Sequence, residues 1–180
     1  GVYRAMDKLG SAGVSAIAAE AKVDERYLKE WLASNAARGY VSYDAEADKF
    51  SLTPEQASVF ARESEPTCIQ GLIQGVVGQF VKEDVAIDVF KTGRGRPWGE
   101  HHECCFCGTE RFFRPAYAGH LLDEWIPALD GVEDKLKLGA KVADIGCGLG
   151  TSSILMAEQF PNSTIHAFDF HGPSIEEAKK

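Results

Sequence analysis

The segment that constrains the fold most is residues 144–150, which reads Asp-Ile-Gly-Cys-Gly-Leu-Gly in a chain of 180 residues. It follows an apolar stretch that starts at Lys141 and precedes a helix-like run, Thr151–Ala157. A strand, a glycine-rich turn and a helix in this order form the front of a β-α-β unit. The three glycines let the backbone turn tightly and keep side chains away from a ligand. We therefore expect a parallel α/β sheet with a ligand site at the turn; the alternative is a plain turn that needs only small residues.

A second predicted strand, Thr164–Phe168, ends at Asp169, nineteen positions after Gly150. A carboxylate at the tip of the second strand can accept hydrogen bonds from both hydroxyls of a ribose. A dinucleotide fingerprint would need glycine three residues after its second glycine, but position 151 is Thr. Asp144 would also repel a pyrophosphate and suits a cation. The spacing therefore favours a positively charged adenosine cofactor over a dinucleotide.

This pattern resembles the first motif of class I S-adenosylmethionine-dependent methyltransferases, and Asp169 resembles the acidic residue of their second motif. The resemblance implies that the glycine loop contacts the amino-acid part of S-adenosylmethionine and that Asp169 binds its ribose. Phe170 would pack on the adenine or, alternatively, on the sheet edge. His171 would lie at the cofactor rim or simply in the loop. The predicted cofactor-binding residues are Asp144, Gly146, Gly148, Gly150, Asp169 and Phe170.

The first 65 residues have the pattern of a winged helix. Three short helices are predicted, with Ser15 and Asp24 as caps of the second and third, and Gly39 just past the third. Alternating residues at 40–43 and 49–52 predict a hairpin. Thr53-Pro54-Glu55-Gln56 then has the capping-box pattern at the start of a fourth helix.

The fold class expected is α/β, in three parts. Residues 1–65 form a mainly α winged-helix domain, residues 66–139 a helical connector and lid, and residues 140–180 the start of a Rossmann-like methyltransferase sheet. The order of these three parts, together with the segment Thr109–Pro115, resembles that of bacterial methyltransferases with an N-terminal winged-helix domain. This group includes mycobacterial members. The resemblance implies a homodimer through the N-terminal region. Because that family's sheet has seven strands, we expect an N-terminal fragment that alone lacks turnover and binds cofactor weakly.

The connector carries an apolar helical stripe between Ile69 and Phe90, typical of a core or dimer surface. A run rich in histidine and cysteine, 101–107, could be read as a zinc site, but its spacing lacks a second ligand pair, so no metal is predicted. We expect a lid over the cofactor pocket instead, with His101 or His102 as a candidate general base; the catalytic residue is not assigned. The candidate apolar walls of the lid are Trp98, Phe106, Phe112 and Phe113.

The charge balance opposes nucleic-acid binding. The formal net charge is −8, and residues 1–65 hold eleven acidic against eight basic side chains. A winged-helix DNA-binding regulator with a small-molecule-sensing domain is the alternative function. No apolar run approaches the length of a membrane span, and five cysteines, an odd number, favour thiols in the cytoplasm. We therefore expect a cytoplasmic enzyme that methylates a small-molecule acceptor at O, N or C.

Overall fold

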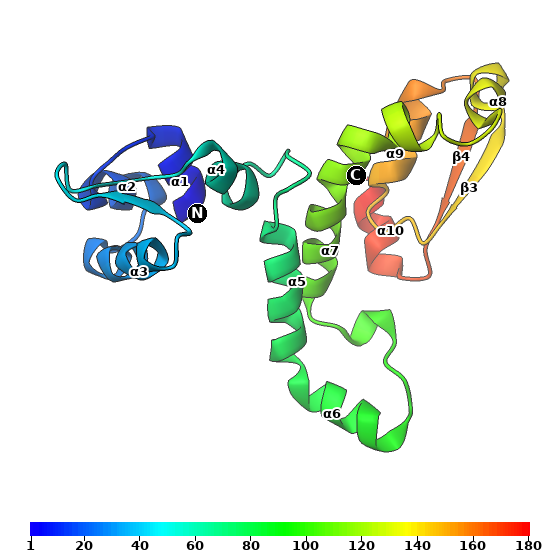
Figure 1. Cartoon of the computed structure of the whole chain (residues 1–180). Coiled ribbons are helices and arrows are strands. Elements are labelled where there is room, and N and C mark those ends of the chain that lie inside the picture. The colour runs from blue at the N-terminus through cyan, green and yellow to red at the C-terminus, as the bar shows by residue number, and fades with distance from the viewer. The chain divides into compact units, whose positions relative to one another are not determined.

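A computed structural model describes residues 1–180. The chain divides into two compact units, residues 1–69 and residues 70–180. Figure 1 shows the helices α1–α4 with the strands β1 and β2 in the first unit, and all later elements in the second. Residues 70–139 and 140–180 share one unit, so the predicted division into a connector and a separate sheet domain stays a prediction.

The first unit is a winged helix, with three helices, a two-stranded wing and a fourth helix. Antiparallel β1 and β2 pair with Tyr43 opposite Phe50. Met6, Ile17 and Leu32 are fully buried at the centre of its core. Its elements are α1 Val2–Leu9, α2 Val14–Ala21, α3 Glu25–Ala37, β1 Ser42–Asp44, β2 Lys49–Ser51 and α4 Pro54–Phe60.

Two of the three predicted helix caps are confirmed. The Asp24 side chain accepts a hydrogen bond from the Tyr27 N–H at 3.1 Å. Thr53 and Gln56 form the full capping box, each side chain bonding the other residue's backbone N–H. Ser15 was wrong as a cap because α2 begins one residue earlier, which places Ser15 inside the helix.

The first wing strand starts at Ser42 rather than at the predicted residue 40. The N–H of Tyr40 donates to the Asn35 carbonyl, and that of Gly39 donates to Ala36, both at 3.0 Å. This is the Schellman pattern of a helix end, and the φ of 76° at Gly39 is the left-handed conformation it requires. Tyr40 is thus part of the end of α3 and cannot begin the ladder.

The second unit combines a helical layer with a two-stranded parallel sheet. The sheet pairs β3 with β4, so that Ile145 lies opposite Phe168. Ile126, Leu136 and Phe160 form a buried cluster beside it. The elements are α5 Gln70–Val81, α6 Glu83–Thr92, η1 Trp98–Glu100, α7 Glu103–Ala116, η2 Tyr117–Trp125, α8 Val132–Leu138, β3 Lys141–Ile145, α9 Thr151–Gln159, β4 Thr164–Phe168 and α10 Gly172–Ala178.

Helices α5 and α7 lie side by side and touch through glycines (Figure 1). A Cβ added to Gly71 would lie 2.4 Å from the Phe112 nitrogen, and one added to Gly108 would lie 2.4 Å from the Gly75 nitrogen. No side chain can fit at either point. The backbones of the two helices therefore pack in direct contact, which fixes the position of α7 against α5.

Helix α7 continues into η2, a stretch of π-helix that begins after Pro115. Proline has no N–H to donate, so the regular hydrogen-bond ladder is interrupted there. The wider turn places Tyr117 at its start, and Leu121 and Leu122 further along pack on the buried cluster of Ile126, Leu136 and Phe160. The α7–η2 segment thereby bridges the glycine contact with α5 and the core beside the sheet.

Candidate functional site

The glycine loop between β3 and α9 is held open by its own backbone. Gly146, Gly148 and Gly150 all have positive φ, between 56° and 83°. A Cβ on Gly146 or Gly148 would meet nothing within 4 Å, whereas one on Gly150 would meet Ala178 at 3.4 Å. The first two glycines thus face open space, and Gly150 serves the turn into α9, where it is the N-cap.

Hydrogen bonds tie this loop to the end of β4. The N–H groups of Gly146 and Cys147 both donate to the Phe168 carbonyl, at 2.7 and 3.0 Å. The Gly148 N–H donates to Asp169 Oδ2 at 2.9 Å, while Oδ1 of the same carboxylate accepts from the His171 N–H at 2.8 Å. Asp169 therefore fixes the shape of the loop as well as standing at the strand tip.

Asp144 is bound by the first turn of α9. Its Oδ2 accepts hydrogen bonds from the hydroxyls of Ser152 and Ser153, each at 2.7 Å. The carboxylate, which the strand directs toward the loop, thus accepts from two neutral donors. It can attract a cation without being paired to one within the chain.

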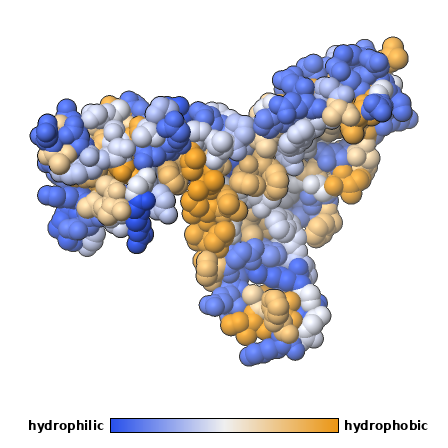
Figure 2. All heavy atoms as spheres, in the orientation of Figure 1, coloured by the Kyte–Doolittle hydropathy of each residue, from blue (hydrophilic) through white to orange (hydrophobic).

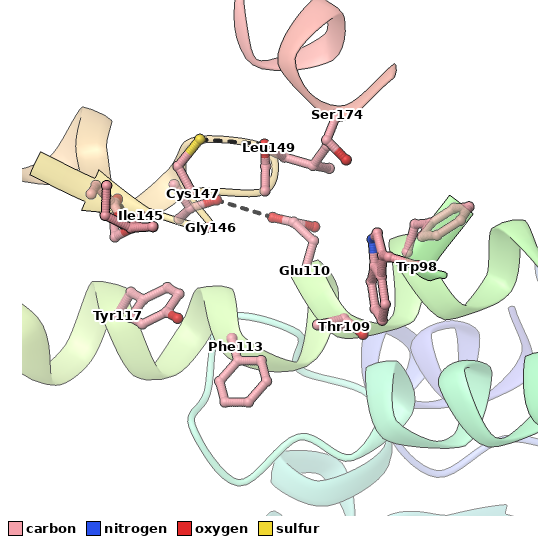
Figure 3. Close-up of a pocket in the computed structure, with 15 residues that line it drawn as sticks. Trp98, Thr109, Glu110, Phe113, Tyr117, Ile145, Gly146, Cys147, Leu149 and Ser174 are labelled. Carbon is pink, nitrogen blue, oxygen red and sulfur yellow. Dashed lines mark hydrogen bonds between the residues drawn. The ribbon is translucent and has the colours of Figure 1, made fainter. Parts of the chain in front are cut away.

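A cavity of about 270 Å³ lies between the loop and helix α7. Figure 3 shows Tyr117, Phe113, Glu110 and Trp98 across from Gly146 and Cys147. Its lining holds two carboxylates, Asp144 and Glu110, and no lysine, arginine or histidine. The lining residues are Trp98, Phe106, Thr109, Glu110, Phe113, Tyr117, Asp144, Ile145, Gly146, Cys147, Gly148, Leu149, Thr151, Ser152 and Ser174.

The predicted cofactor residues occupy different places around this cavity. Asp144, Gly146 and Gly148 line it. Gly150 caps α9, and Asp169 is not among the lining residues but accepts a hydrogen bond from the Gly148 N–H. Phe170 is 80% exposed and does not line this cavity, so its contact with an adenine stays a prediction.

Three of the four predicted lid residues, Trp98, Phe106 and Phe113, line the cavity. Phe112 does not, and that expectation was wrong. It lines a separate apolar hollow of about 360 Å³ along α5, together with Gly71 and Gly108. Adjacent residues on a helix point about 100° apart, so Phe113 lines both hollows, whereas Phe112 lines only the one along α5.

The histidines lie near the cavity but do not line it. His102 caps α7 by accepting from the Cys104 N–H at 3.2 Å. Burial, followed by the nearby Arg96, lowers the pKa of His101, whose ring packs on Trp98. The His171 ring packs on Phe106 at 4.8 Å between centroids. The role of His101 or His102 as a general base therefore stays a prediction.

Sequence reasoning missed Glu110, Tyr117 and Cys147 as cavity residues. Cys147 lies between two glycines of the loop, and only this position in the sequence could have indicated that it lines the cavity. Burial, then the charges of Asp144 and Asp169, raises the pKa of its thiol.

The five cysteines are all free thiols, and the chain contains no cluster of three or more histidine, cysteine or acidic side chains able to hold a metal ion.

Residues 1–62 match the family of Rv2258c-like winged HTH domains. A protein from Nostoc punctiforme assigned as an O-methyltransferase superposes with a TM-score of 0.66 at 18% identity, covering 99% of this chain and 51% of its own. The fold of the present chain is that of the N-terminal half of an O-methyltransferase. Among curated protein sequences none matches the chain significantly.

Two further structures agree with this fold. The mitomycin 7-O-methyltransferase MmcR has a TM-score of 0.63 at 17% identity, with 99% of this chain and 53% of that chain covered. Human N-acetylserotonin methyltransferase, solved with S-adenosylmethionine, has a TM-score of 0.59 at 17% identity, with 99% and 55% covered. The chain thus spans about half the length of the structures it resembles. None of its helices is both long enough and apolar enough to span a bilayer.

Proposed function

We propose that this chain provides half of the cofactor site of an S-adenosylmethionine-dependent methyltransferase that acts on a small molecule. The observation that carries the proposal is the bond from the Gly148 N–H to Asp169 beside a cavity whose charged lining is acidic. The fold shared with the O-methyltransferase structures supports it. The proposed cofactor residues remain Asp144, Gly146, Gly148, Gly150, Asp169 and Phe170.

The chemistry of the cavity fits this cofactor better than a dinucleotide. S-adenosylmethionine carries a sulfonium and an ammonium group, and carboxylates attract both. A pyrophosphate would instead face Asp144 and Glu110 with no lysine or arginine in the lining. The open space above Gly146 and Gly148 lets a ligand approach the backbone directly.

The residues of the chain would act mainly by positioning. Bound S-adenosylmethionine supplies a methyl group already activated on its sulfonium. Asp169 would accept from the ribose hydroxyls while it keeps the loop in shape. Trp98, Phe106 and Phe113 would keep water out of the cavity, which strengthens its electrostatic interactions.

We also propose that the complete protein is a homodimer. Helix α5 exposes an apolar face that Figure 2 shows as a continuous hydrophobic patch. Soluble monomers rarely expose large contiguous apolar patches, and a second copy would bury this one. The residues of this patch are Leu72, Ile73, Val76, Val77, Phe80 and Val81, each 45–74% exposed.

Calorimetric titration of the complete gene product tests the function. We expect S-adenosylmethionine and its demethylated product, S-adenosylhomocysteine, to bind with dissociation constants in the micromolar range, and NAD not to compete. Binding of NAD in preference to both would contradict the proposal. A mobility-shift assay at low salt tests the DNA-binding alternative, which requires that residues 1–69 retard duplex DNA.

A further inference from the structure

Glu110 is the second carboxylate of the cavity, and it comes from helix α7 rather than from the sheet. Figure 3 shows its side chain reaching from α7 toward the loop that carries Gly146 and Cys147. It accepts a hydrogen bond from the Thr151 hydroxyl at 3.4 Å. Only 19% of the Glu110 side chain is exposed. Glu110 therefore contributes a charge to the cavity at the point where the loop joins α9.

The charge on Glu110 is only partly compensated inside the chain. Its one ion pair is with Arg114, one helical turn along, at 3.4 Å, and the Arg114 side chain is 49% exposed. Such exposed pairs within a helix contribute little. Thr151 and Arg114 both contact Oε1, so Oε2 makes no bond within the chain. A partly buried carboxylate with a free oxygen is stabilised by a cationic donor.

The other acid of the cavity is engaged differently. Asp144 already accepts two short hydrogen bonds from Ser152 and Ser153. Each carboxylate thus keeps one oxygen without a bond inside the chain, but the contacts that Glu110 makes are longer, 3.4 Å against 2.7 Å, so Glu110 is the less satisfied of the two. It also stands beside Thr151, the first residue of α9, whose N-terminus carries a partial positive charge. A negative and a positive site lie side by side there, which matches an amino-acid zwitterion.

We propose that Glu110 binds the ammonium group of the methionyl part of S-adenosylmethionine. The inference rests on the proposed function and adds to the glycine loop a contact made by α7. An ammonium group has three N–H donors and forms short, charge-assisted bonds with a carboxylate. A sulfonium has no N–H, so the ammonium group is the part of the cofactor that Oε2 can bond.

The test compares three ligands by calorimetry on the complete gene product and its Glu110→Gln variant. S-adenosylmethionine carries ammonium and sulfonium, S-adenosylhomocysteine carries ammonium only, and 5′-methylthioadenosine carries neither. We expect Glu110→Gln to weaken the first two about tenfold to a hundredfold and the third less than about twofold. Glu103→Gln, an exposed acid at the start of the same helix, is the matched control and should leave all three unchanged.

Each other result overturns the inference in a recognisable way. Weaker binding of S-adenosylmethionine alone would mean that Glu110 faces the sulfonium. Equal weakening of all three ligands would mean a structural role. Unchanged binding of all three, with or without loss of methyl transfer, would remove Glu110 from the cofactor site. If the unaltered protein binds none of the three, the proposed function itself fails, and this inference fails with it.

Discussion

Gly148 and Asp169 lie 21 residues apart and are joined by a hydrogen bond of 2.9 Å from the glycine N–H to the carboxylate Oδ2. Because Oδ1 also accepts from the His171 N–H, one side chain holds the tip of β4, the glycine loop and the start of α10 together. Asp169, the residue proposed to bind the ribose of the cofactor, therefore also maintains the shape of the loop.

Replacing Asp169 should affect both roles. In Asp169→Asn, one carboxylate oxygen becomes an NH2 group, so the side chain can accept from only one of the Gly148 and His171 N–H groups, and the charge is lost. We expect the affinity for S-adenosylhomocysteine to fall by at least about tenfold, since hydrogen bonds to charged groups contribute roughly 1.5–3 kcal/mol. Asp123→Asn, an exposed acid on η2, is the control. Equal affinities of the two variants, measured by calorimetry, would show that Asp169 is not a ligand.

The glycine contact between α5 and α7 predicts opposite effects for neighbouring glycines. Gly71→Ala and Gly108→Ala each place a Cβ 2.4 Å from a backbone nitrogen, which should destabilise the fold by about 1–3 kcal/mol. A Cβ at Gly75 meets nothing within 4 Å, so Gly75→Ala should be neutral or stabilise by up to about 1 kcal/mol. Urea unfolding midpoints distinguish them, and a destabilised Gly75→Ala would argue against the helix packing described.

The raised pKa of Cys147 predicts slow alkylation. Burial first, and then the charges of Asp144 and Asp169, disfavour its thiolate, which is the reactive form. A raised pKa moves the onset of reaction to higher pH. Iodoacetamide labelling followed by peptide mass spectrometry should therefore show Cys147 reacting at higher pH than the exposed Cys107. The same pH profile for both thiols would contradict the environment described for the loop.

The exposed face of α5 predicts that a charge there separates the proposed dimer. Phe80 is 74% exposed, and Phe80→Glu would place a carboxylate within the apolar patch. Sedimentation velocity of the complete gene product should show a dimer that Phe80→Glu shifts toward monomer. Lys91→Glu, on α6, places a carboxylate outside the patch and should not shift it. A monomeric unaltered protein would refute the dimer.

Local chemistry explains which parts of the fold the sequence could predict. The capping box at Thr53 and the left-handed Gly39 follow from neighbouring residues alone. The late start of β1 depends on Tyr40 completing the helix end, which competes with strand pairing. Strand propensities and the alternation of side chains do not reveal this competition between the helix end and strand pairing, so the predicted strand began too early.

The candidate site was predictable in part for the same reason. Asp144 and the glycines lie in one short segment, and the spacing of these residues along the sequence indicates a cofactor site. Glu110 comes from a helix more than 30 residues earlier, and only the packing of α7 against the loop brings it there. Nothing in the spacing of Glu110 itself relates it to the loop.

We propose that the loop from Asp144 to Gly150 is the S-adenosylmethionine site. Hydrogen–deuterium exchange of the complete gene product, with and without S-adenosylhomocysteine, tests it most directly. We expect ligand-dependent protection in residues 144–151 and 168–171, because a bound ligand would cover these amides and hold the loop hydrogen bonds closed. Protection confined to other segments while the ligand is bound would contradict the claim.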